Sequence, residues 1–79
     1  MQLLLDYAAA DPAAWQQDFD ARAEMRAAAG LSLLQIWRDE ANGAVVCLFE
    51  LRDRSGAEEW LKVEGELHGA GTARFLKTL

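Results

Sequence analysis

The sequence predicts one α+β domain in which a four-stranded antiparallel sheet carries two helices on one face. Three observations lead to this prediction. Apolar strand-like runs and helix-like segments follow one another in the order β-α-β-β-α-β. The pair Asn42-Gly43 between the second and third runs is a strong signal for a tight hairpin. The 79 residues leave room for a single domain, which we expect to span residues 1–79.

The first strand is expected over Gln2–Tyr7, where three consecutive leucines and an aromatic residue form an apolar run. Asp11 then suits the N-cap of a helix and Pro12 its first position, and Gly30 suits the C′ position after its end. The buried stripe of this helix is predicted from apolar residues that recur every four positions: Trp15, Phe19, Ala23 and Ala27.

Two further strands are predicted on either side of the hairpin, over Leu31–Arg38 and Ala44–Leu51. Simple alternation in the second strand would place one set of side chains on one face (Leu31, Leu33 and Trp37) and another set on the opposite face (Leu34 and Ile36).

The second helix is expected to begin with a capping box formed by Ser55 and Glu58. We expect it to end or falter at Gly65, with a separate short turn over Glu66–His68 and a glycine-rich break before the closing strand Thr72–Leu79. Right-handed crossovers place the first and third strands at the centre of the sheet and the other two at its edges. This arrangement is a ferredoxin-like βαββαβ fold.

The composition disfavours several classes of function. The net charge of −5 repels phosphate backbones and anionic lipid surfaces, so neither nucleic acid nor a membrane is expected as a partner. A single cysteine, Cys47, and a single histidine cannot form an internal disulfide or a structural zinc site, and we expect no metal or cofactor. No signal-peptide pattern or membrane-length apolar run is present, so a cytoplasmic location is expected.

The strands are apolar on both faces, although two helices can cover only one face of a sheet. In the third strand Val45, Cys47 and Phe49 are apolar, and so are Val46 and Leu48 on the opposite face. An exposed apolar sheet face exceeds what monomers usually tolerate. The sequence therefore predicts a homodimer that pairs through its sheet faces.

The chain resembles the dimeric α+β barrel superfamily, which includes cofactor-independent antibiotic-biosynthesis monooxygenases and small YCII-like proteins. The resemblance covers nearly the whole chain and rests on its pattern of elements. The segments that carry it are Asp11-Pro12-Ala13-Ala14-Trp15, Phe19-Asp20, Arg26–Leu31, Arg38–Gly43 and Phe49–Asp53. The resemblance implies an obligate dimer whose sheets enclose a cavity, which in the enzymes of this superfamily binds aromatic or other apolar small molecules.

Four residues are candidates for contacting a ligand. Tyr7 ends the first strand and either faces the cavity or, the reading we favour, keeps its hydroxyl in water. Gln35 interrupts an apolar strand and either anchors a ligand or bonds across the dimer contact. Trp37 shares its face, and packing is the simpler role for it. Arg26 lies beside the helix stripe, where it either follows the core margin or binds a carboxylate.

Two residues are candidates for proton transfer. Glu50 follows an apolar strand, where a cavity would raise its pKa, although a paired or hydrated carboxylate is the more common situation. His68 is the only imidazole and lies in the glycine-rich segment that could overhang a pocket, although a solitary histidine in a flexible turn is more often exposed and idle. Cys47 lies in an apolar strand and is expected to be a core residue.

Three functions agree with these observations. The first is a small dimer that binds an apolar or aromatic molecule between its sheets. The second is a cofactor-independent monooxygenase-like or cyclase-like enzyme, with His68 or Glu50 as the base and with Trp37 and Tyr7 holding the substrate. The third is a structural or regulatory dimer whose interface is filled by side chains.

Overall fold

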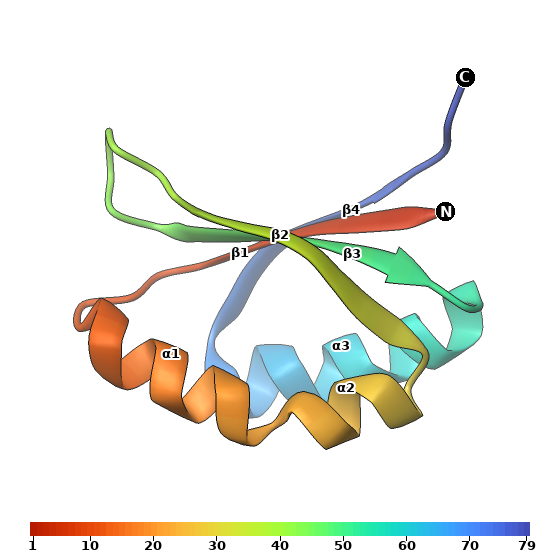
Figure 1. The fold of residues 1–79 in the computed structure, drawn as a ribbon, viewed down its shortest axis with the longest axis horizontal. Coiled ribbons are helices and arrows are strands. Elements are labelled where there is room, and N and C mark those ends of the chain that lie inside the picture. The colour runs from red at the N-terminus through yellow and green to blue at the C-terminus, as the bar shows by residue number, and fades with distance from the viewer.

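The structure, a computed structural model, describes residues 1–79 as a sheet with one layer of helices (Figure 1). Its four strands are antiparallel and lie in the order β2-β3-β1-β4, so the prediction of central first and third strands is confirmed. This order is compatible with a ferredoxin-like fold. The elements are β1 (Gln2–Tyr7), α1 (Pro12–Ala21), α2 (Ala23–Ala28), β2 (Leu31–Arg38), β3 (Val45–Leu51), α3 (Arg54–His68) and β4 (Ala70–Leu76).

The segment predicted as one long helix is interrupted at Arg22, which separates α1 from α2. Its ends are as predicted, because Asp11 Oδ1 accepts a hydrogen bond from the Ala14 N–H at 3.2 Å and Gly30 has φ +84°. Beyond Phe19 the predicted stripe is wrong, because Ala23 and Ala27 are exposed. Arg22 and Arg26 take the inward positions instead, where their guanidinium groups find partners in the core.

Helix α3 differs from the prediction at both ends. Its N-cap is Asp53, whose Oδ1 accepts hydrogen bonds from the Gly56 N–H at 2.7 Å and from the Ser55 hydroxyl at 3.0 Å, so the predicted capping box is wrong. These bonds lower the pKa of the Asp53 carboxyl below its ordinary value. The helix also continues through Gly65 to His68 and ends before Gly69, which has φ +72°. No separate turn follows Gly65.

The register between β2 and β3 shifts between Leu33 and Gln35. Leu33 pairs with Phe49 and Gln35 with Leu48, so one additional residue, Leu34, is accommodated in β2. This shift contradicts the simple alternation predicted for the strand, because Trp37 does not share a face with Leu31 and Leu33. Trp37 instead pairs with Val46, on the face that the helices leave uncovered.

The hydrophobic core lies between the sheet and the helices. Its largest fully buried side chains are Tyr7, Phe19 and Phe49, and the rings of Trp15 and Phe19 stack at 4.8 Å between centroids. In the central strands β1 and β3, residues that point toward the helices are buried, whereas residues of the opposite face are half-buried. That opposite side is called the open face below. None of the three helices has the length and apolar character needed to cross a membrane.

Candidate functional site

The residues proposed from the sequence lie on two sides of the sheet. Gln35, Trp37 and Glu50 belong to the open face, since they pair with or lie among its residues. Tyr7 and Arg26 are buried on the helix side, and His68 ends α3 in the helix layer. One pocket within a single subunit therefore cannot contain all of them.

The centre of the open face is apolar. Leu4 of β1 pairs directly with Leu48 of β3, and both side chains are half-buried, as is that of Val46. Trp37 on the neighbouring strand β2 is exposed, and so is Gln35. The side chain of Gln35 is therefore in contact with water in the single subunit. Its amide does not need a hydrogen-bond partner from the protein, as a buried amide would.

A hollow of about 260 Å³ lies over the central strands and β4 on this side of the sheet. Apolar side chains line part of it, and the carboxylate of Asp6 and the guanidinium of Arg74 supply charges of opposite sign. Asp6 is held in place, because its Oδ1 accepts a hydrogen bond from the Thr72 N–H at 3.0 Å. The residues that line the hollow are Leu4, Leu5, Asp6, Val46, Thr72 and Arg74.

Glu50 lies at the end of the open face and already has a partner. The Gln2 side-chain amide donates a hydrogen bond to its Oε2 at 2.6 Å. Its Oε1 also lies 3.5 Å from the N-terminal ammonium group of Met1. This is the paired carboxylate that the sequence offered as the alternative to a catalytic base.

Tyr7, Glu64 and Arg22 form a buried polar cluster on the helix side of the sheet. Glu64 of α3 is 2 % exposed and accepts a hydrogen bond from the Tyr7 hydroxyl at 3.1 Å. Arg22 Nη1 bonds to both carboxylate oxygens of Glu64, at 2.5 Å to Oε2. The expectation of a hydrated Tyr7 hydroxyl is therefore wrong. Burial, and secondarily the charge of Glu64, raises the pKa of Tyr7 above its ordinary value.

Arg26 lies deeper than the core margin expected from the sequence. Its Nη1 donates to the Phe19 carbonyl oxygen at 2.5 Å, and its guanidinium carbon is 3.6 Å from the centroid of the Phe19 ring. Burial and the neighbouring charge of Arg22 lower the pKa of this arginine. These contacts account for its position without a ligand.

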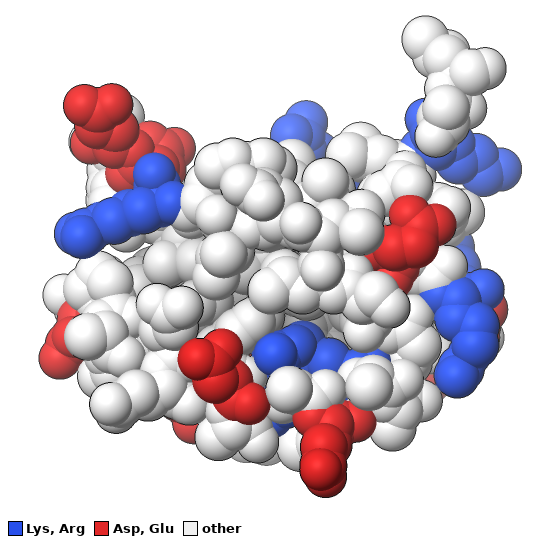
Figure 2. Space-filling view, viewed as in Figure 1, with Lys and Arg blue, Asp and Glu red and all other residues white.

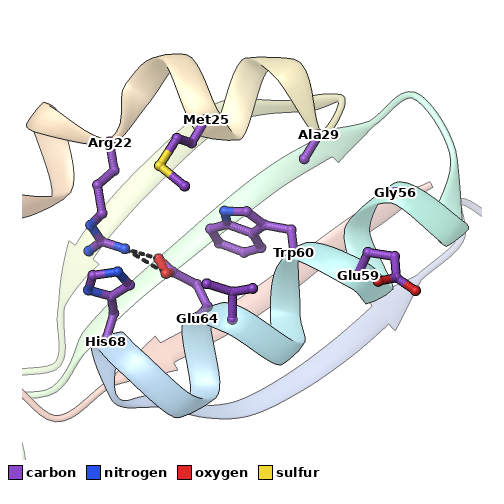
Figure 3. A pocket seen from close by; sticks show the side chains of 9 residues that line it. Arg22, Met25, Ala29, Gly56, Glu59, Trp60, Glu64 and His68 are labelled. Carbon is purple, nitrogen blue, oxygen red and sulfur yellow. Dashed lines mark hydrogen bonds and ion pairs between the residues drawn. The ribbon is translucent and has the colours of Figure 1, made fainter.

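His68 lies at one end of a groove of about 400 Å³ between α2 and α3 (Figure 3). Its Nδ1 is 3.6 Å from Asp18 Oδ2, and Arg22 Nη2 lies 3.4 Å from the same oxygen. Figure 3 shows Trp60 in the middle of the groove, with Met25 on the opposite helix. The groove is lined by Arg22, Met25, Ala29, Gly56, Glu59, Trp60, Val63, Glu64 and His68.

The sequence reasoning missed Arg22 and Glu64 as a pair. Glu64 lies four residues after Trp60, so it continues the buried stripe of α3, and this position was the available signal. Arg22 lies three residues after Phe19 and continues the inward face of α1 in the same way. Charged residues at apolar stripe positions on two helices indicate a buried ion pair.

Cys47 is fully buried, as predicted, and burial raises the pKa of its thiol to about 12. The structure holds no group of three His, Cys, Asp or Glu side chains placed to bind a metal ion. Comparison of the chain with protein-family models, with curated proteins and with solved structures gives no match.

Proposed function

We propose that this protein acts as a homodimer whose sheets pack through their open faces and enclose a site for a small apolar or aromatic molecule. The observation that carries the proposal is the uncovered apolar centre of the sheet, formed by Leu4, Val46, Leu48 and Trp37. Burial of such side chains against a second copy removes apolar surface from water, which is worth roughly 25 cal/mol per Å².

The charges around this centre favour a second copy over an unrelated partner. Asp6 and Glu50 supply carboxylates on the open face, and Arg74 supplies a guanidinium. In an interface between two copies related by a two-fold axis, every contact between residue i and residue j occurs twice, so a face that carries both carboxylates and a guanidinium can set opposite charges against each other.

The shape of the molecule also leaves this side free. Figure 1 shows the β2–β3 hairpin and the C-terminal end rising beyond the sheet, away from the helices and at opposite ends of the sheet. Figure 2 shows the molecule edge-on to the sheet, with mostly uncharged side chains and a basic side chain rising behind them between these two ends. A second copy packed on the open face would contact the β2–β3 hairpin at one end and the C-terminal segment at the other.

The hollow beside Leu4 and Val46 supports the ligand part of the proposal. It is open in a single subunit, and a partner sheet would close it into an apolar space with Asp6 and Arg74 at its margin. Ligand sites commonly combine an apolar lining with a few charged or polar groups in this way.

The enzyme hypothesis receives no support from this geometry. It required a base, His68 or Glu50, beside a substrate held by Trp37 and Tyr7. His68 and Tyr7 are separated from Trp37 by the sheet, and Glu50 is paired with Gln2 and with the N-terminal ammonium of Met1.

Sedimentation equilibrium of matched variants tests the dimer. Leu48→Asp places a carboxylate at the centre of the open face, and we expect it to weaken association by at least about a hundredfold. Leu67→Asp is the control, because Leu67 is 71 % exposed on α3 and lies away from the open face. Dimers of the control and monomers of Leu48→Asp support the proposal, whereas equal masses for both variants refute it.

Titration with indole, an uncharged aromatic probe, tests the site. We expect the NMR signals of Leu4 and Val46 to shift in the dimer and to stay unchanged in Leu48→Asp. A dimer whose open-face signals do not respond would instead be the structural dimer with a filled interface, and the ligand part of the proposal would be wrong.

A further inference from the structure

The groove between α2 and α3 has an apolar body that the fold leaves exposed. Met25 of α2 is 58 % exposed and Val63 of α3 is 42 % exposed, and both line the groove together with Trp60. The volume of about 400 Å³ lies within the range of small-molecule sites. An apolar chain or ring placed here would cover both walls at once.

The polar end of the groove presents a buried donor that forms no hydrogen bond. Arg22 Nη2 is buried and makes no hydrogen bond, although Arg22 Nη1 is fully engaged by Glu64. Buried N–H groups nearly always have a hydrogen-bond acceptor, and the nearest carboxylate oxygen to this atom, Asp18 Oδ2 at 3.4 Å, is in ion-pair contact without forming a hydrogen bond. His68, whose imidazole is partly exposed, lies beside it and adds a second possible donor.

Asp18 shows which chemical group fits at this end. Its carboxylate oxygen is 3.4 Å from Arg22 Nη2 and 3.6 Å from His68 Nδ1, in contact with both groups but outside hydrogen-bond geometry with the arginine. Its side chain is 60 % exposed, so water can reach its carboxylate. Removal of Asp18 would leave two arginines, Arg22 and Arg26, facing the single carboxylate of Glu64, and an anion would restore the balance.

We propose that this groove binds a small amphipathic carboxylate, with its carboxylate at Arg22 and His68 in the place of the Asp18 side chain and its apolar part along Trp60 between Met25 and Val63. This site lies on the helix side of the sheet. It is independent of the pairing of open faces, and it does not require a second subunit.

Three ligands with the same tail test the chemistry: decanoate, decanol and decylamine. Binding is followed by NMR through the Trp60 indole and the amides of Met25 and Val63. We expect decanoate to bind at least about fivefold more tightly than decanol, and decylamine to bind more weakly than either. Equal affinity for decanoate and decanol, or a preference for decylamine, would refute the carboxylate assignment.

Three variants test the placement. Asp18→Ala removes the competing carboxylate, and we expect it to bind decanoate several-fold more tightly, a direction that a merely structural role for Asp18 would not produce. Val63→Asp is expected to weaken binding by about tenfold or more, and the matched control Leu67→Asp to leave it unchanged, because Leu67 lies on the same helix outside the groove. Met25→Asp repeats the wall test on α2 in case Val63→Asp does not fold.

Unchanged or weaker binding by Asp18→Ala would overturn the proposal, as would equal losses in Val63→Asp and Leu67→Asp. Repeating the titration with Leu48→Asp separates this site from the proposed dimer. If Leu48→Asp binds decanoate with unchanged affinity, the groove is independent of the oligomeric state. If the variant loses both the dimer and decanoate binding, the proposal of an independent groove is contradicted.

Discussion

At the scale of single residues, the least expected feature is the charged cluster inside so small a core. Glu64 joins β1 to the helix layer through the Tyr7 hydroxyl and the Arg22 guanidinium. A buried ion pair contributes little net stability compared with apolar residues of the same size, but loss of one partner leaves the other charge buried and unpaired. The cluster therefore contributes little to the free energy of unfolding, and its main effect is to fix the position of α3 against the sheet.

Glu64→Leu is expected to lower the free energy of unfolding by about 3–5 kcal/mol, because Arg22 and Tyr7 lose their acceptor. The double variant Arg22→Leu with Glu64→Leu should recover much of this loss. Urea unfolding at neutral pH measures both effects. A single-variant loss below about 1 kcal/mol, the range of exposed ion pairs, would contradict the burial of this pair.

Cys47 gives a prediction of pH dependence. Its thiol pKa rises from 9.0 to about 12 on folding, so the folded state keeps a proton that the unfolded state releases. Stability from this group is complete below about pH 9 and is lost as the pH rises toward 12. Urea unfolding as a function of pH should therefore show a smaller alkaline decline for Cys47→Ala than for the unmodified protein. An identical decline in both would contradict the assignment.

The same thiol should be inert in the folded protein, because it is buried and protonated. We expect a chromogenic aromatic disulfide to label Cys47 slowly at mildly alkaline pH and rapidly once urea is added. Rapid labelling without urea would show that the strand face is accessible.

At the scale of elements, the sequence predicted the existence and order of nearly every helix and strand but not their details. The Asp11 cap, the Gly30 end and the Asn42-Gly43 hairpin were predictable because each depends on local backbone chemistry. The interruption at Arg22 and the register shift in β2 were not, because they depend on contacts with residues far away in the sequence.

The end of α3 shows why a glycine alone predicts poorly. Gly65 was read as a helix end, but it lies on an open side of the helix with nothing within 4 Å of an added Cβ. The helix continues because Glu64, directly before it, is anchored in the core. The termination instead falls at Gly69, where the backbone adopts φ +72°.

Two alanine substitutions test whether the helix ends at Gly65 or at Gly69. Gly65→Ala should raise the free energy of unfolding by about 0.5–1 kcal/mol, since it lies in the helix interior with space for a methyl group. Gly69→Ala should lower it by about 1–2 kcal/mol, because a left-handed conformation is strained for alanine. Thermal or urea unfolding measures both, and the same sign for the two variants would contradict the position of the helix end.

At the scale of the whole molecule, the sequence predicted the four-stranded sheet, its strand order and the single helix-covered face. It could not assign the candidate site residues to their faces. Tyr7, Arg26 and Trp37 were all candidates for contacting a ligand, but strand alternation and helix packing put the first two on the opposite side of the sheet from Trp37. The polar cluster and the groove could not be predicted, because they combine residues from β1, the α1–α2 junction and α3.

The pairing of open faces is the central claim, and isotope-filtered NMR on a mixture of labelled and unlabelled chains tests it most directly. The proposal predicts nuclear Overhauser effects between subunits for Trp37, Val46 and Leu48. Nuclear Overhauser effects between subunits that are confined to the helix layer would contradict the proposal. The absence of any such effect, together with sedimentation that detects only single chains, would contradict it as well.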